Sequence, residues 1–130
     1  MSQTKDMVEV KQNVTWDEAL ESEAWIAPLV DIYETEDDFL LTAVMPGVKK
    51  ENVKIKLEEG SLVLMGRIEY NDVVNRKFVL KETESGNFYR RFKIADSVDE
   101  SNIDAKLENG ILNVKLPKQE RVKPRNIEIK

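Results

Sequence analysis

The sequence predicts an all-β protein, an antiparallel β-sandwich, and three observations support this prediction. From Leu29 to Lys118 the chain consists of short apolar runs separated by turn residues, without a long helical period. Two stretches that begin at Val53 and Ile103, VKIKLEEGSLVL and IDAKLENGILNV, repeat one pattern of strand, glycine turn and strand. Because no segment supplies the helical crossovers that parallel strands need, the strands are expected to pair antiparallel.

The residues before the sandwich, 1–28, are expected to form an N-terminal arm. In TWDEALESEAWIAP, Thr15 is placed to cap a helix, Glu18 stands at the capping-box position and Pro28 is a stop signal. Trp16 and Leu20 would lie on one stripe of that helix. A helix this short needs packing partners, so the pattern leaves two alternatives, an amphipathic helix or a disordered arm.

Outside the two hairpins, apolar runs predict four further strands, over residues 29–33, 39–44, 78–80 and 88–94. Met45-Pro46-Gly47 ends the second of these. The polar segment 69–77 is expected to be a long loop that leads into the third.

The turn dipeptides set the register of both hairpins. Asn109-Gly110 and Glu59-Gly60 are two-residue turns; at Asn109-Gly110 both positions tolerate positive φ. The two turns predict five apolar pairs across the strands: Leu107 with Leu112, Ala105 with Val114, Ile103 with Leu116, Leu57 with Leu62, and Ile55 with Leu64. Every apolar residue in these pairs meets an apolar partner, which supports both hairpins.

Length and composition point to one domain with tails, because 130 residues of which 41% are hydrophobic can bury a core. We expect an arm over 1–28, a domain over 29–118 and a C-terminal extension over 119–130. The chain contains no cysteine and has neither a signal-peptide core nor a membrane-spanning run, so a soluble cytoplasmic protein is expected. The net charge of -5 opposes nucleic-acid binding.

The chain contains few of the residue types on which enzymes commonly rely for catalysis. Histidine and cysteine are absent, which removes the commonest general base, metal ligand and thiol nucleophile. The acid pairs Asp37-Asp38 and Glu58-Glu59 lie beside turns, where solvated charge is the better interpretation. The glycines stand singly at turns and form no phosphate loop. We therefore expect no catalytic residues, no cofactor and no metal.

The C-terminal segment KPRNIEIK raises a separate question. Ile127 and Ile129 alternate with polar residues at strand spacing, yet they follow Pro124 on a tail with no partner strand of its own.

Four of these signals together resemble the small heat shock proteins, the α-crystallin domain family of ATP-independent chaperones. AKLENGILNV is similar to the family's A-x-x-x-N-G-x-L-x-V signature, and MPGVKKENVKIKLEEGSLVLMGR to its proline-glycine lead into a hairpin. GNFYRRFKI is similar to its arginine-bearing strand, and RNIEIK to its Ile-x-Ile anchor. The resemblance covers Pro28 to Lys130, while Met45 and Ala95 depart from the family's usual leucine and proline.

The resemblance implies an immunoglobulin-like sandwich with an apolar groove that accepts an Ile-x-Ile segment. Such a segment adds ladder bonds to a sheet edge while Ile127 and Ile129 fill neighbouring pockets. The residues expected to line the groove are Val53, Ile55, Leu57, Ile103, Ala105 and Leu107.

The resemblance implies that Arg90 lies at a dimer interface. By alternation it shares a face with Phe88 and Phe92, where an unpaired charge is costly, so carboxylate partners are expected. The alternative is an edge-strand arginine that reaches water. In non-animal members of the family a loop strand swaps into the partner's sheet, and residues 69–82 are long enough to do so.

The resemblance implies a holdase that assembles from dimers into oligomers and captures unfolding client proteins without nucleotide. The expected client contacts are the groove and four residues of the arm: Trp16, Leu20, Trp25 and Ile26. A different class is a co-chaperone or scaffold module of related fold that binds one folded partner; the Ile-x-Ile tail argues against it. Neither nucleic acid nor membrane is expected as a partner.

Overall fold

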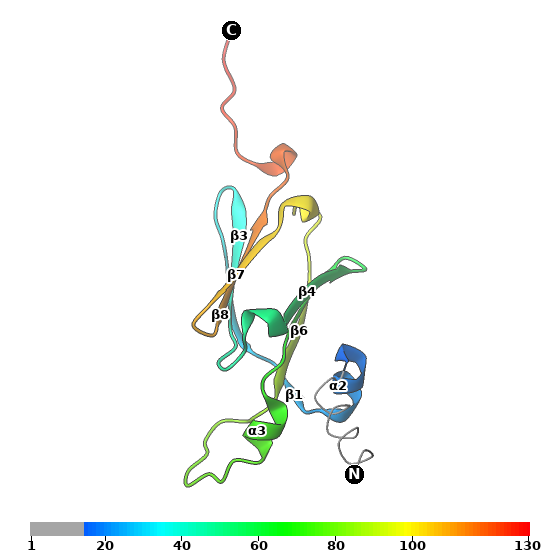
Figure 1. The fold of residues 1–130 in the computed structure, drawn as a ribbon. Helices are drawn as coiled ribbons and strands as arrows, with labels where there is room; N and C mark the ends of the chain where they lie inside the picture. Colours follow the sequence, from blue (N-terminus) through cyan, green and yellow to red (C-terminus); the bar gives the residue numbers. More distant parts are fainter. Residues whose placement is uncertain (1–14) are drawn as a thin grey trace.

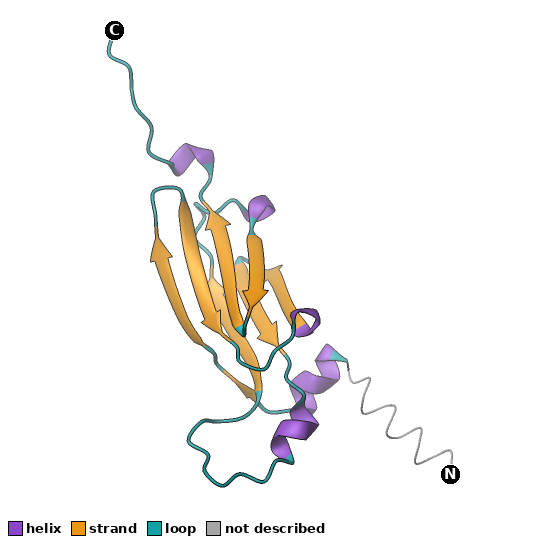
Figure 2. Cartoon of the chain, turned by 60° about the vertical axis from the view of Figure 1, so that its left-hand side comes forward, coloured by secondary structure: helices purple, strands orange, loops and turns teal. Residues whose placement is uncertain are grey.

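A computed structural model describes residues 15–130 and shows two four-stranded sheets that face each other (Figures 1 and 2). The order is β1-β6-β5-β4 in one sheet and β2-β3-β8-β7 in the other. The strands are β1 (Trp25–Ile26), β2 (Leu29–Glu34), β3 (Asp38–Val44), β4 (Val53–Glu58), β5 (Ser61–Gly66), β6 (Asn87–Lys93), β7 (Asp104–Glu108) and β8 (Ile111–Pro117). All pair antiparallel except β1 with β6, so the predicted all-β antiparallel sandwich is confirmed.

Two short α-helices and three 3-10 turns complete the described chain. They are α2 (Trp16–Ser22), α3 (Tyr70–Val74), η1 (Lys50–Asn52), η2 (Glu100–Asn102) and η3 (Glu120–Val122). Helix α2 begins with the predicted capping box, in which the Thr15 hydroxyl accepts from the Glu18 N–H. It ends at Ser22, well before Pro28, because the backbone of Glu23 is already extended (φ -106°). The Glu23 side chain accepts a hydrogen bond from Asn87.

Both hairpins have the predicted register. Four of the five predicted apolar pairs are present: Leu107 with Leu112, Ala105 with Val114, Leu57 with Leu62, and Ile55 with Leu64. The fifth, Ile103 with Leu116, is wrong, because the β7–β8 ladder ends at Asp104 and Lys115. The turn residues Asn109 and Gly110 have φ of 50° and 76°, and Glu59 and Gly60 have φ of 50° and 74°. Ile103 precedes the first residue of β7 and so lies just outside the ladder.

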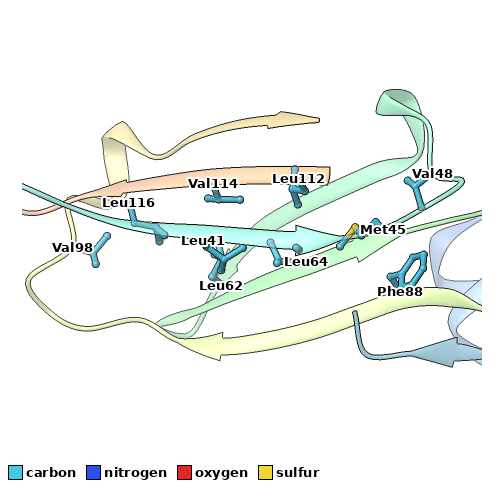
Figure 3. Close-up of a cluster of buried hydrophobic side chains, with 11 residues drawn as sticks. Leu41, Met45, Val48, Leu62, Leu64, Phe88, Val98, Leu112, Val114 and Leu116 are labelled. Carbon is cyan, nitrogen blue, oxygen red and sulfur yellow. The ribbon is translucent and has the colours of Figure 1, made fainter. Parts of the chain in front are cut away.

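The core lies between the two sheets (Figure 3). Its buried side chains come from alternate positions on facing strands, chiefly Leu41, Ala43, Leu62, Leu64, Phe88, Leu112, Val114 and Leu116. The opposite face of β5 is buried as well, with Val63 and Met65 at most 2% exposed. Helix α2 lies toward that face, since the Trp16 ring is 5.9 Å from the Nζ of Lys54, whose Cα pairs with Met65.

The strand predicted over 78–80 is wrong for this chain. Residues 75–85 carry no helix or strand, and Val79 is fully exposed. The apolar residues there match a strand, but a strand also needs a neighbour to pair with, and no strand within residues 15–130 pairs with this loop. Helix α3 occupies the start of the same segment, where only loop was expected.

The two turn glycines allow a paired test of packing at the second hairpin. Replacing Gly60 with alanine introduces only the conformational strain of a side chain at positive φ, because no atom lies within 4 Å of the added Cβ. Alanine at Gly110 carries the same cost, and its Cβ also lies 3.0 Å from the Pro46 Cα. We expect Gly60→Ala to lower the free energy of unfolding by about 1–2 kcal/mol and Gly110→Ala by about 2–4 kcal/mol, measured by urea denaturation. Equal losses of unfolding free energy in the two variants would show that Pro46 moves away from the added Cβ at no measurable cost.

Candidate functional site

An open groove runs between β4 and β7, the outer strands of the two sheets. It consists of two adjoining hollows of ≈410 and ≈320 Å³. The six residues predicted to line it all do so: Val53, Ile55, Leu57, Ile103, Ala105 and Leu107. Ile55 and Ala105 line both hollows and join them.

The groove combines apolar walls with unpaired backbone. β4 pairs only with β5, and β7 only with β8, so each presents a free edge within the described chain. Ala105 is exposed and small, which leaves room between the branched side chains on either side. An extended segment with apolar residues at alternate positions fits such a site.

The C-terminal tail does not lie in this groove. Its start is fixed, because Lys118 Nζ donates to Glu34 at 2.8 Å and to the Thr35 carbonyl at 2.7 Å. Beyond η3 the chain leaves the sheets as an extended segment (Figures 1 and 2). Ile127 and Ile129 are 82% and 94% exposed, so residues 15–130 of a single chain cover neither the groove nor the isoleucines.

Arg90 contacts different groups from those expected. Its Nη1 donates to the buried Pro28 carbonyl at 3.1 Å, and its guanidinium lies 5.0 Å from the Phe92 ring centre. Among residues 15–130 no carboxylate pairs with it, so the expected carboxylate is not part of this chain's fold. The chain crosses from one sheet to the other at Pro28, which brings that carbonyl to the core side of β6.

A second exposed apolar surface lies at the other edge of the sandwich. β2 is the outer strand of its sheet, and its Leu29, Ile32 and Tyr33 are at least half exposed. The loop residues Val79 and Leu80 are also exposed. In the described part of the chain, the outer edge of β2 is thus unpaired, and the loop of strand-like sequence pairs with no strand.

The arm residues predicted to bind clients are mostly docked on the sandwich. Trp16, Trp25 and Ile26 are half-buried, and only Leu20 is exposed. The Trp25 Nε1 donates to the Ala19 carbonyl at 2.8 Å, and the two indole rings lie 6.3 Å apart. β1 joins the sheet beside the start of β6.

A polar cluster that the sequence did not indicate holds this arm. Arg67 Nη2 lies 3.1 Å from a Glu23 oxygen, and Asn87 Nδ2 donates to the other at 2.6 Å. Asn87 is fully buried, and its Oδ1 accepts from the Ile68 N–H. No motif marks these residues, and they are 19 to 64 positions apart; the one local signal is glycine directly before the polar Asn87.

Hydrogen bonds between side chains shift the pKa of several surface groups. The Glu58 hydrogen bond raises the pKa of Arg91, and the Glu108 bond raises the pKa of Lys106 at the groove rim. The Ser101 hydroxyl lowers the pKa of Asp99. Each shift favours the form already charged at neutral pH. Within residues 15–130 no group of three acidic or other ligand side chains is placed to hold a metal ion.

Comparisons with known proteins agree with this geometry. The Hsp20/alpha crystallin family pattern matches residues 31–130. The chain is similar to the probable 15 kDa heat shock protein of Leptospira interrogans, with 36% identity over 94 residues that cover 72% of each protein. It is 41% identical over 97 residues to the 16.9 kDa class I heat shock protein 3 of Oryza sativa, covering 73% of this chain and 65% of the rice protein, just under two thirds of its length.

Solved structures give the same result for the fold. The small heat-shock protein from Xylella fastidiosa superposes with a TM-score of 0.67 at 31% identity, over 82% of this chain and 99% of that chain. The hspA protein from Xanthomonas axonopodis gives 0.65 at 32% identity, over 74% and 97%. No helix in the described part of the chain is both long and apolar enough to cross a bilayer.

Proposed function

The chain belongs to the Hsp20/alpha crystallin family, the small heat shock chaperones, and we propose that it acts as an ATP-independent holdase. It would bind partly unfolded proteins through apolar surface and keep them from aggregating. The main support is that residues 15–130 of one chain leave both an apolar groove and an Ile-x-Ile tail uncovered. Apolar burial is non-directional, which suits many clients.

In the proposed assembly, the extension 119–130 reaches from one subunit into the β4–β7 groove of another. Ile127 and Ile129 are two residues apart, so in extended chain they point the same way about 6.6 Å apart, enough to enter adjoining hollows. Burying both contributes about 3–6 kcal/mol before the entropy of ordering the tail is subtracted. Each tail contact is therefore weak and reversible.

The proposed building block is a dimer. The loop 69–82 would add its apolar stretch to the open β2 edge of a partner, as the resemblance to non-animal members implies. Arg90 would meet a partner carboxylate there. Its bond to the Pro28 carbonyl uses one of five N–H donors, which leaves four to form a bidentate ion pair.

Client contacts are proposed for the groove and for Trp16, Leu20, Trp25 and Ile26 of the arm. Leu20 is 41% exposed, whereas the other three need the arm to detach before they present their full apolar surface. The proposal involves no catalysis and no cofactor.

The test is suppression of client aggregation without nucleotide. We expect a molar excess of the protein to reduce the light scattering of a heated model client, with no change on adding ATP. An equal mass of an inert protein is the control. Client turbidity equal to that control would contradict the holdase proposal and favour a module that binds one folded partner.

A further inference from the structure

The segment Glu23–Ile26 lies along β6 as a short added strand at the edge of its sheet (Figures 1 and 2). It pairs parallel with only the first two residues of β6, Asn87 and Phe88. The Asn87 N–H donates to the Ala24 carbonyl at 2.8 Å. This edge is opposite to β4 in the same sheet, so it is separate from the groove described above.

Two side chains of the sandwich, Arg67 and Asn87, bind the carboxylate of Glu23. Arg67 Nη2 approaches the two carboxylate oxygens at 3.1 and 3.4 Å, and Asn87 Nδ2 donates at 2.6 Å. Asn87 is fully buried and tied to the Ile68 N–H through its Oδ1. The carboxylate receptor is therefore built from β6 and the end of β5, outside the arm.

Gly86 makes room for the added strand. A Cβ at this position would lie 2.9 Å from the Ala24 carbonyl oxygen and 3.3 Å from its carbon. The next nearest atom is the Ile26 Cγ2, at 3.5 Å. All three belong to the arm, so the missing side chain serves the docked strand and not the packing of the sandwich.

The arm is a weak occupant of this edge. Only two residue pairs join it to β6, and the seven-residue α2 is too short to be stable without packing. Trp16, Trp25 and Ile26 keep part of their surface in water even when docked. Another extended segment of similar chemistry can therefore compete for the place.

We propose that the edge of β6, with Arg67, Asn87 and Gly86, is a binding site for extended client segments, and that Glu23–Ile26 is a built-in occupant that clients displace. The ligand class follows from the occupant: an extended stretch of a partly unfolded protein with an acidic residue shortly before an aromatic and a branched apolar residue. This inference rests on the proposed holdase function and names a site for it.

Two substitutions separate release of the arm from loss of the site. Glu23→Ala removes the carboxylate of the occupant and leaves the receptor intact. Gly86→Ala excludes any strand from the edge. Glu21→Ala removes the same charge from an exposed position and is the matched control. The protein has two tryptophans, and both, Trp16 and Trp25, lie in the arm, so intrinsic emission reports the arm alone.

The probe is a fluorescein-labelled peptide ESEAWIAP, the sequence of residues 21–28, and its counterpart is ESQAWIAP, which lacks only the Glu23 carboxylate; binding is followed by anisotropy. We expect red-shifted tryptophan emission in both Glu23→Ala and Gly86→Ala, with far-ultraviolet circular dichroism close to that of the parent. Glu23→Ala should bind the peptide ESEAWIAP roughly tenfold to a hundredfold more tightly than the parent, because the protein's own segment 23–26 then competes less strongly for the site. Gly86→Ala should bind neither peptide, and Glu21→Ala should match the parent.

Equal peptide binding by Gly86→Ala and Glu23→Ala would overturn the proposal, since the site would then lie elsewhere. Parent-like emission in both variants would also overturn it, because the arm would not be held as described. The expected peptide results in a protein that fails to protect a heated client would support the site and contradict the holdase function, so the two failures are distinguishable.

Discussion

Replacing Arg90 with alanine is expected to lower the melting temperature by about 10 °C and to weaken the dimer, whereas Arg91→Ala leaves both near the parent values. The adjacent arginines carry the same charge on opposite faces of β6. Arg90 shares the core side with Phe92 and binds the buried Pro28 carbonyl. Arg91 is on the exposed side, paired with Glu58 at 3.0 Å.

The expected loss of melting temperature in Arg90→Ala follows from the groups that lose their partner when the arginine is removed. Losing a hydrogen bond to a charged donor and a cation–π contact costs about 2–4 kcal/mol within one chain. If a partner carboxylate also pairs with Arg90, the dimer loses both copies of that ion pair, and the unpaired carboxylates are costly to keep buried. The surface pair of Arg91 is screened by water and contributes little.

Melting by circular dichroism and mass by sedimentation velocity separate the two parts of this prediction. A lower melting temperature with unchanged dimer mass would place the role of Arg90 at the Pro28 crossing alone. An unchanged melting temperature would show that neither contact matters, and Arg91→Ala controls for the loss of one positive charge from β6.

The hairpins were predictable from the sequence because their information is local. Asn109-Gly110 supplies two positive φ angles between alternating strands, and one turn then determines every cross-strand pair up to Asp104 and Lys115. The six groove residues lie on or directly beside the outer strands of these hairpins, and it was the family resemblance that indicated a groove between those two strands. The capping box of α2 is local in the same sense.

The missed features depend on residues far apart in the chain. The partner of Arg90 is a backbone carbonyl 62 positions away, and alternation indicates only the face of a side chain, not the group that it meets. Glu23 and Asn87 are 64 positions apart and belong to no motif. Residues 78–80 have strand composition, but composition cannot supply the second edge that a ladder requires.

The largest effect on assembly is expected from replacing Ile127 and Ile129 with alanine. Both are exposed in the single chain, so their loss leaves the sandwich unchanged and far-ultraviolet circular dichroism should match the parent. Each subunit loses about 3–6 kcal/mol of gross apolar burial at the proposed groove contact. Because an assembly held by several tails loses all of them at once, the variant should elute as dimers where the parent elutes as a larger species.

A matched control lies on the same tail. Asn126→Ala with Glu128→Ala alters the alternate positions, which point away from the groove in an extended segment, and should keep the parent's elution profile. The reciprocal change, Ala105→Trp, fills the junction of the two hollows and should reproduce the effect of the double isoleucine variant. If the isoleucine variant elutes as the parent does while Ala105→Trp disrupts the assembly, the groove accepts a segment other than the tail, and the N-terminal arm becomes the next segment to test.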